Sequence, residues 1–269
     1  MSFSSVVVLE GLNETNFFVS EDGNPITPIK VNVATASTCV SLVLDFSGSM
    51  IRGLKPAIDK LRPAAKGFVE KMPENYCAEV IRFSDDSDRT MGFTKDKDAL
   101  KVAIDAAIPS RWLGGTALFD AICMAIDDIT ANDGYCLDSN AVVVMTDGCD
   151  QASKTCSATA VIKKAKDKGV PVFVIGLKSQ EYPLCPEPLT TIAVQTGGVY
   201  YETDDPNKLK DIYEKIGTTL TGQYVVEYTT AVCGSSSSPD VRRSLTVEVI
   251  AGTGCGKDEE EVPCPSKCK

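Results

Sequence analysis

Apolar and polar positions in the middle of the chain alternate between two patterns. Short, nearly continuous apolar runs predict buried strands, and longer stretches with apolar residues at helical spacing predict amphipathic helices. Strands are predicted at Cys39–Asp45, Ala78–Phe83, Ala141–Met145, Pro171–Leu177 and Val199–Tyr201. Helices are predicted at Leu54–Lys71, Lys95–Ala107, Ala117–Ile129, Ala158–Lys168, Pro188–Gln195 and Pro206–Leu220. This alternation predicts an α/β fold, with a doubly wound, mainly parallel sheet flanked by helices on both faces.

The two ends of the chain show short apolar runs separated by turn residues. At the N-terminal end these runs are Ser5–Leu9, Asn16–Pro25 with a turn at Asp22-Gly23, and Ile29–Val33. At the C-terminal end they are Gln223–Thr229 and Ser244–Ile250. Strands this short are not stable alone, so we expect them to combine into a small β-sandwich formed from both termini. The expected domains are residues 1–37 (N-terminal strands), 38–221 (the α/β domain) and 222–269 (C-terminal strands and a cysteine-rich tail).

Oxygen-bearing side chains stand where three predicted elements meet loops. They lie in Asp45-Phe46-Ser47-Gly48-Ser49, in Gly114-Gly115-Thr116 and in Thr146-Asp147-Gly148. Each segment alone could be an ordinary turn or helix start, because Asp, Ser and Thr are common there. Right-handed crossovers, however, bring the carboxyl ends of parallel strands to one edge of the sheet. Carboxylates and hydroxyls gathered at that edge suit a hard divalent cation.

These three segments, in this order, resemble the von Willebrand factor A domain, and the resemblance covers roughly residues 39–221. It implies a metal-ion-dependent adhesion site that binds Mg²⁺, with Mn²⁺ and Ca²⁺ also compatible. It also implies a short antiparallel edge strand near Arg89–Phe93. The segment Phe18–Pro25 resembles that of exported bacterial proteins that carry this domain. The five residues that match the family's metal-liganding positions are Asp45, Ser47, Ser49, Thr116 and Asp147.

Composition restricts the class of partner. The net charge of −10 argues against nucleic acid and against anionic membranes as partners bound through a basic patch. No apolar run is long enough to span a bilayer, so direct membrane insertion is not expected. The first ten residues lack the basic region and the long apolar stretch of a signal peptide. The protein is then either cytosolic, or an export signal is absent from this sequence.

Cysteine content favours export. Eleven cysteines exceed ordinary cytosolic use, and most fall in predicted loops, so we expect disulfides and a secreted, periplasmic or cell-surface location. We expect Cys123 to be free, as a small apolar residue on the inner face of its helix. Cys149 and Cys185 could be bridged beside the site, although connectivity cannot be deduced from sequence. The other cysteines expected to be oxidised are Cys39, Cys77, Cys136, Cys156, Cys233, Cys255, Cys264 and Cys268.

Other motifs fit less well. The run Gly252–Lys257 is rich in glycine, but it lacks the first glycine of a P-loop and the hydroxyl residue after the lysine, so we interpret it as a loop. The charged run Asp258–Glu261 is interpreted as a solvated tail. Zinc held by Cys255, Cys264 and Cys268, with or without Cys233, is an alternative to disulfides in the tail.

The resemblance to the von Willebrand factor A domain implies a non-enzymatic protein that binds an acidic side chain, Asp or Glu, of a partner protein through a divalent cation. The first alternative is a structural component of a surface or pilus assembly, in which the metal site closes a permanent contact. A long exposed apolar patch would favour it. The second alternative is a metal-dependent hydrolase. It would need a general base near Asp45, and the chain contains no histidine.

Overall fold

The computed structural model divides the chain into two compact units, residues 36–220 and residues 1–35 with 221–269. Among the described residues, no helix combines the length and apolarity needed to cross a bilayer. The structure describes residues 12–33, 38–51, 57–108, 114–131, 139–178, 184–203, 205, 207–221, 224–229, 242–251 and 254–263.

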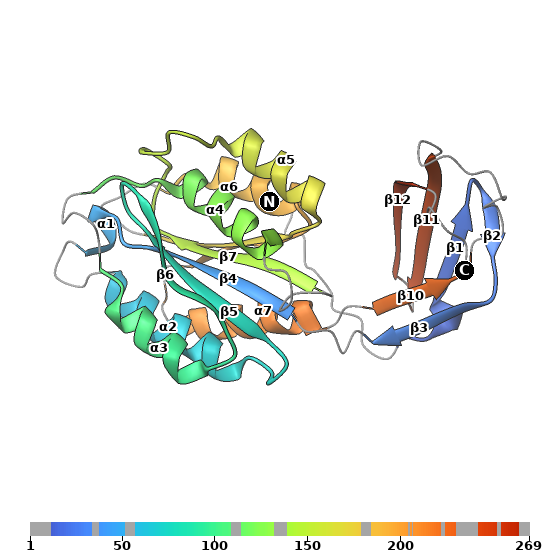
Figure 1. Ribbon diagram of the computed structural model, residues 1–269, viewed down its shortest axis with the longest axis horizontal. Coiled ribbons are helices and arrows are strands. Elements are labelled where there is room, and N and C mark those ends of the chain that lie inside the picture. The colour runs from blue at the N-terminus through green and yellow to red at the C-terminus, as the bar shows by residue number, and fades with distance from the viewer. Residues whose placement is uncertain are drawn as a thin grey trace. The chain divides into compact units, whose positions relative to one another are not determined.

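The larger unit contains a six-stranded sheet (Figure 1) with the strand order β6-β5-β4-β7-β8-β9. The neighbouring pairs are parallel except β5 and β6, which are antiparallel. This confirms the expected mainly parallel sheet with one antiparallel edge strand. The strands are β4 (Thr38–Asp45), β5 (Cys77–Phe83), β6 (Ser87–Thr94), β7 (Ser139–Thr146), β8 (Val172–Leu177) and β9 (Tyr200–Thr203).

Helices cover both faces of this sheet (Figure 1). One apolar cluster joins the sheet to α2, α3 and α7, and a second joins its other face to α4, α5 and α6. All eight residues of β4 are buried, because this central strand is covered on both faces. The helices are α1 (Gly48–Ile51), α2 (Ile58–Lys71), α3 (Lys97–Ala106), α4 (Leu118–Ala131), α5 (Ala158–Lys168), α6 (Pro186–Gln195) and α7 (Asn207–Thr221).

Capping side chains set where two of these helices begin. Helix α3 starts after Asp96, whose carboxylate accepts hydrogen bonds from the backbone N–H groups of Asp98 and Ala99. Helix α5 starts after Ser157 and ends at Lys168, and it is capped by Gly169, which has φ 64°. The predicted α3 began two residues earlier, at Lys95, because apolar periodicity does not mark the cap.

The smaller unit is built from strands of both ends of the chain. A four-stranded sheet has the order β12-β11-β1-β2, and β3 pairs with β10 in a two-stranded sheet. The short 3-10 helix η1 (Glu14–Asn16) precedes β1. The strands are β1 (Phe17–Glu21), β2 (Asn24–Ile26), β3 (Ile29–Val33), β10 (Tyr224–Tyr228), β11 (Arg242–Ala251) and β12 (Gly254–Pro263).

Strand β12 corrects the prediction of a loop at Gly252–Lys257 from Gly254 onward, and that of a tail at Asp258–Glu261, whereas residues 252–253 lie outside the described residues. The strand pairs antiparallel with β11 from Arg242↔Pro263 to Ala251↔Gly254. Polar sequence hid this strand, because β12 is an edge strand, and charged residues are tolerated on sheet edges. The predicted strand Ser5–Leu9 lies outside the described residues.

Three disulfides lie in the described part of the chain, and one of them corrects a prediction. Cys39 pairs with Cys77, and Cys149 pairs with Cys185, as the expected oxidation of these residues requires. Cys123 was expected to be free but pairs with Cys156. Its helix α4 packs against α5, and Cys156 lies two residues before α5, so the two thiols meet between these helices. The predictions for Cys136, Cys233, Cys264 and Cys268, and for the Cys255 side chain, fall outside the described residues.

Candidate metal centre

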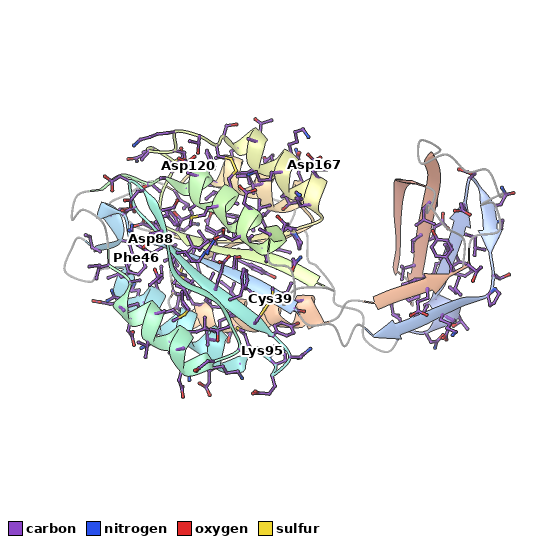
Figure 2. The ribbon with its side chains drawn as sticks, viewed as in Figure 1. Cys39, Phe46, Asp88, Lys95, Asp120 and Asp167 are labelled. Carbon is purple, nitrogen blue, oxygen red and sulfur yellow. A yellow bond between two sulfur atoms is a disulfide. The ribbon has the colours of Figure 1, made fainter. Side chains whose placement is uncertain are left out.

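The candidate site lies at the carboxyl ends of two central strands. Asp45 is the last residue of β4, and Asp147 directly follows β7, the parallel neighbour of β4. The chain runs from β4 to β5 on one side and reaches β7 on the other. The strand order therefore reverses at β4, which is where open α/β sheets bind ligands. Two residues labelled in Figure 2 lie toward this end of the sheet: Phe46, which follows Asp45, and Asp120, in the first turn of α4.

The Asp45 carboxylate is fully buried and held at both oxygens. The backbone N–H of Ser47 donates to Oδ1 at 2.7 Å, and the hydroxyl of Thr146 donates to Oδ2 at 2.6 Å. This role of Thr146 was not predicted, because its position directly before Asp147 does not indicate where its hydroxyl points. These two contacts fix the direction in which the remaining lone pairs of Asp45 point.

Hydroxyl groups connect Asp45 to Asp147. The Oγ atoms of Ser47 and Ser49 lie 3.1 Å apart, and the Ser49 hydroxyl donates to Oδ1 of Asp147 at 2.7 Å. Ser47 and Asp147 are buried, whereas Ser49 is partly exposed. The structure thus brings four of the five predicted residues into one hydrogen-bonded group that reaches the surface at Ser49.

The fifth residue, Thr116, lies beside this group and is 4% exposed. Its hydroxyl oxygen is 3.9 Å from where a Cβ atom on Gly148 would stand, so it lies next to the Asp147 loop. The backbone N–H of Gly48 donates to the carbonyl of Gly114 at 3.1 Å. The three loops predicted to converge are therefore in contact with one another.

The electrostatics of the site favour a bound cation. Burial raises the pKa of Asp45, although hydrogen bonds from Ser47 and Thr146 oppose the shift. Burial, and then the negative charge of Asp45, raise the pKa of Asp147 to about 7. In the described part of the chain, no Lys or Arg nitrogen lies within 4.0 Å of either carboxylate. Two buried carboxylates without a cationic side chain are stabilised by an added positive charge.

The chemistry of the donors fits Mg²⁺. Among the described residues, no three His, Cys, Asp or Glu side chains form a group that could hold a metal ion, and the side chains in contact with this carboxylate pair are hydroxyls. Mg²⁺ is commonly held by one or two carboxylates and keeps several waters. Ca²⁺ takes six to eight oxygen ligands, often from more carboxylates, and a donor set of two carboxylates and three hydroxyls suits it less well. The residues present thus fit a small hard dication with water in its shell.

The comparison with protein families gives a match within the larger, α/β unit. The family model of the von Willebrand factor type A domain matches residues 40–215, which include all five candidate residues. No curated protein matches the chain significantly.

Several solved structures have the same fold at low identity. The von Willebrand factor type A protein from Catenulispora acidiphila is 12% identical, with a TM-score of 0.61, covering 92% of this chain and 69% of that one. Proximal thread matrix protein 1 from the mussel byssus, solved with a zinc-occupied MIDAS motif, is 21% identical, with a TM-score of 0.59, covering 74% and 49%. The vWF domain of the type V pili tip protein Mfa5 from Porphyromonas gingivalis is 16% identical, with a TM-score of 0.57, covering 69% and 95%.

Proposed function

Because the chain belongs to the von Willebrand factor type A domain family, we propose that it binds a partner protein through a divalent cation. The site recognises an acidic side chain of that partner, Asp or Glu. Mg²⁺ is the proposed cation, with Mn²⁺ or Ca²⁺ as substitutes. Its proposed ligands, direct or through water, are Asp45, Ser47, Ser49, Thr116 and Asp147.

One observation carries this proposal. Asp45 and Asp147 are buried side by side, contact hydroxyls, and lie more than 4.0 Å from every described Lys and Arg nitrogen. When bound, the cation supplies an electrophilic position that a partner carboxylate can occupy. The chain's own groups prepare this position: Thr146 and the Ser47 N–H orient Asp45, and Ser49 orients Asp147. A site with only two carboxylates leaves the cation partly uncompensated, which favours an acidic ligand.

The test is capture from a native surface extract by the immobilised full chain. We expect a partner retained in Mg²⁺, released by EDTA and recaptured when Mg²⁺ returns. Asp45→Ala should capture nothing, whereas the control Asp127→Ala should capture normally, because Asp127 lies further along α4 and pairs with Lys164 on α5. Amidation of the partner's carboxyl groups should abolish its binding. Equal capture by the metal-free chain would contradict the proposal.

The dependence of affinity on salt concentration distinguishes direct contact with the cation from the effect of the net charge of the whole chain. A protein with a net charge of −10 repels an acidic partner at long range, and salt screens that repulsion beyond about 8–10 Å. Direct contact with the cation acts at shorter range and is screened less. Raising salt should therefore leave affinity almost unchanged or slightly higher, and a steep loss of affinity would indicate ordinary surface ion pairs instead.

The alternative function is assembly of a surface structure through a permanent contact. The pili tip protein among the structural neighbours favours it. However, the exposed large apolar residues described in the α/β unit do not form one patch: Val102 and Ile108 belong to α3 and the residues after it, and Val194 to α6 on the other face. A partner that EDTA does not release would favour assembly.

Export is part of the proposal. Disulfides persist in oxidising compartments, and Cys39–Cys77, Cys123–Cys156 and Cys149–Cys185 are all formed. Thiol counting on denatured, unreduced protein from its native source should find few free thiols. Nearly eleven free thiols would place the protein in a reducing compartment.

A further inference from the structure

The carboxylate of Asp120 holds a loop beside the candidate metal centre. Asp120 lies in the first turn of α4, four residues after Thr116. Its Oδ1 accepts hydrogen bonds from the backbone N–H of Cys156 at 2.7 Å and of Thr155 at 3.0 Å, and from the Thr155 hydroxyl at 2.8 Å. Its Oδ2 accepts one from the backbone N–H of Lys154 at 2.8 Å. Four donors from three consecutive residues thus converge on one carboxylate.

The same loop makes further contacts with the start of α4. The backbone N–H of Asp120 donates to the Ser153 hydroxyl at 3.0 Å, and that of Phe119 donates to Oδ1 of Asp150 at 3.2 Å. The Ser153 hydroxyl in turn donates to Asp150. The loop therefore satisfies N–H groups at the start of the helix, while Asp120 satisfies N–H groups of the loop. Burial raises the pKa of Asp120, but the hydrogen bonds that its carboxylate accepts from Lys154, Thr155 and Cys156 outweigh this effect and hold the pKa below its usual value.

The other side of this loop contacts Thr116. The backbone N–H groups of Gln151 and Ala152 donate to the Thr116 carbonyl at 2.9 and 3.1 Å. A Cβ atom on Gly115 would stand 3.0 Å from the Cβ of Ala152, so the loop packs closely against this backbone. The position of Thr116 therefore depends on where the loop is held.

Two disulfides fix the ends of the loop, and Asp120 holds the residues next to its second end, Lys154 to Cys156. Cys149, at one end, is bonded to Cys185, and Cys156, at the other end, is bonded to Cys123 on α4. Cys123 is one helical turn after Asp120, so both residues face the loop. The disulfides limit how far residues 149–156 can move, whereas the Asp120 contacts select one conformation among those that remain.

From these contacts we propose that Asp120 is a positioning residue for the metal centre: it fixes the loop 150–156, which in turn fixes Thr116. The proposal rests on the proposed function, because it assigns Thr116 to the metal site. Removing a group that orients a metal ligand typically weakens metal binding 10–100-fold. Asp120 acts through an intervening loop, so we expect the lower end of this range.

The test measures Mn²⁺ binding to the full chain by calorimetry. We expect Asp120→Ala to weaken Mn²⁺ binding about 10-fold. The matched control, Asp127→Ala, removes an ion pair between the same helix and α5, and it should stay within about twofold of wild type, because an exposed pair contributes little. If Asp120→Ala lowers the melting temperature but leaves Mn²⁺ affinity unchanged, the role of Asp120 is structural and the proposal is wrong. If the wild type itself binds no Mn²⁺, the proposed function is wrong, whatever the variants show.

Two further variants keep the test decisive. Asp120→Asn retains one acceptor oxygen and the side-chain shape, and we expect it to weaken binding by about threefold, less than the loss of the whole group. If Asp120→Ala does not fold, an Asn variant with wild-type affinity overturns the proposal. In a Thr116→Ala background, Asp120→Ala should weaken Mn²⁺ binding by less than about twofold, because residues that act through one another are not additive. Full additivity would exclude the route through Thr116.

Discussion

A single buried acid and a pair of buried acids in the same sheet have different surroundings. Glu79, in the middle of β5, is 0% exposed, accepts a hydrogen bond from Ser41 and has an Arg89 nitrogen 3.6 Å away. Asp45 and Asp147, at the strand ends, contact hydroxyls and backbone N–H groups, and lie beyond 4.0 Å of every described Lys and Arg nitrogen. Glu79 has a positively charged neighbour, whereas no Lys or Arg among the described residues contacts Asp45 or Asp147.

The pKa of the enclosed acid is raised, so Glu79 keeps its proton to a higher pH than an exposed carboxylate. Burial raises the pKa of Glu79 to about 8; the Ser41 hydrogen bond opposes this, the charge of Asp128 adds to it, and Arg89 opposes it weakly. Arg89 contacts Asp128 more closely, with its Nε 2.8 Å from Oδ2, which explains why it does not keep Glu79 ionised. A single acid sealed inside the sheet can keep a proton, whereas a carboxylate pair that reaches the surface beside Ser49 is open to a cation. The difference shows that burial of an acid alone does not indicate a metal site.

The largest effect expected from this comparison is in metal binding. Asp45→Ala should lose detectable Mn²⁺ binding in calorimetry, because it removes one of only two carboxylates. Glu79→Gln should bind Mn²⁺ like wild type, because Glu79 is enclosed and pairs with Ser41 of β4, whereas Asp45 pairs with Phe83 at the end of β5. Loss of Mn²⁺ binding in both variants would mean that the two groups act as one, and the comparison would be wrong.

The second effect is in the dependence of stability on pH. The pKa of Glu79 is raised from 4.5 to about 8, so the folded protein holds more protons than the unfolded chain between these values. The contribution of Glu79 is therefore complete below pH 4.5 and is lost as pH rises toward 8, with a slope of at most about 1.4 kcal/mol per pH unit.

Urea unfolding in EDTA, at pH values from 5 to 9, measures this slope. The free energy of unfolding of wild type should fall more steeply with pH than that of Glu79→Gln, since the amide cannot ionise. Contributions from all other groups are shared by the two proteins and cancel in the difference. Parallel profiles would show that Glu79 is already ionised in the folded state.

The smallest effect is a gain in the stability of the metal-free protein when one carboxylate of the metal site is removed. In EDTA at pH 8, Asp147→Asn should be more stable than wild type by roughly 1 kcal/mol, because it removes repulsion from Asp45 and keeps the Ser49 hydrogen bond. Asp88→Asn is the matched control, since the exposed Asp88 carboxylate lies 3.7 Å from Arg82 and should gain nothing. Added Mg²⁺ should reverse the order by stabilising wild type alone. A less stable Asp147→Asn in EDTA would indicate that repulsion between the two carboxylates is not significant.

The sequence by itself determined the α/β unit and the meeting of the three site loops. Continuous apolar strands must be covered on both faces, and right-handed crossovers leave few ways to arrange them, so Asp45, Thr116 and Asp147 had to share one edge. Local patterns carry this information, because strand and helix periodicity depend on residues near one another in the chain. The same reasoning predicted the helices to within a few residues at their ends, except the short α1 (Gly48–Ile51), which was not predicted.

Only the tertiary structure decided the contacts between residues distant in sequence. It paired Cys123 with Cys156, paired the charged strand β12 with β11, and placed Thr146 on Asp45 and Asp120 on the loop at Lys154–Cys156. None of these contacts is predicted by the spacing of apolar residues, because a hydrogen bond or a disulfide depends on where two packed elements bring single atoms together. The residue types at the candidate site follow from local sequence, but the environment that sets their charge exists only after folding.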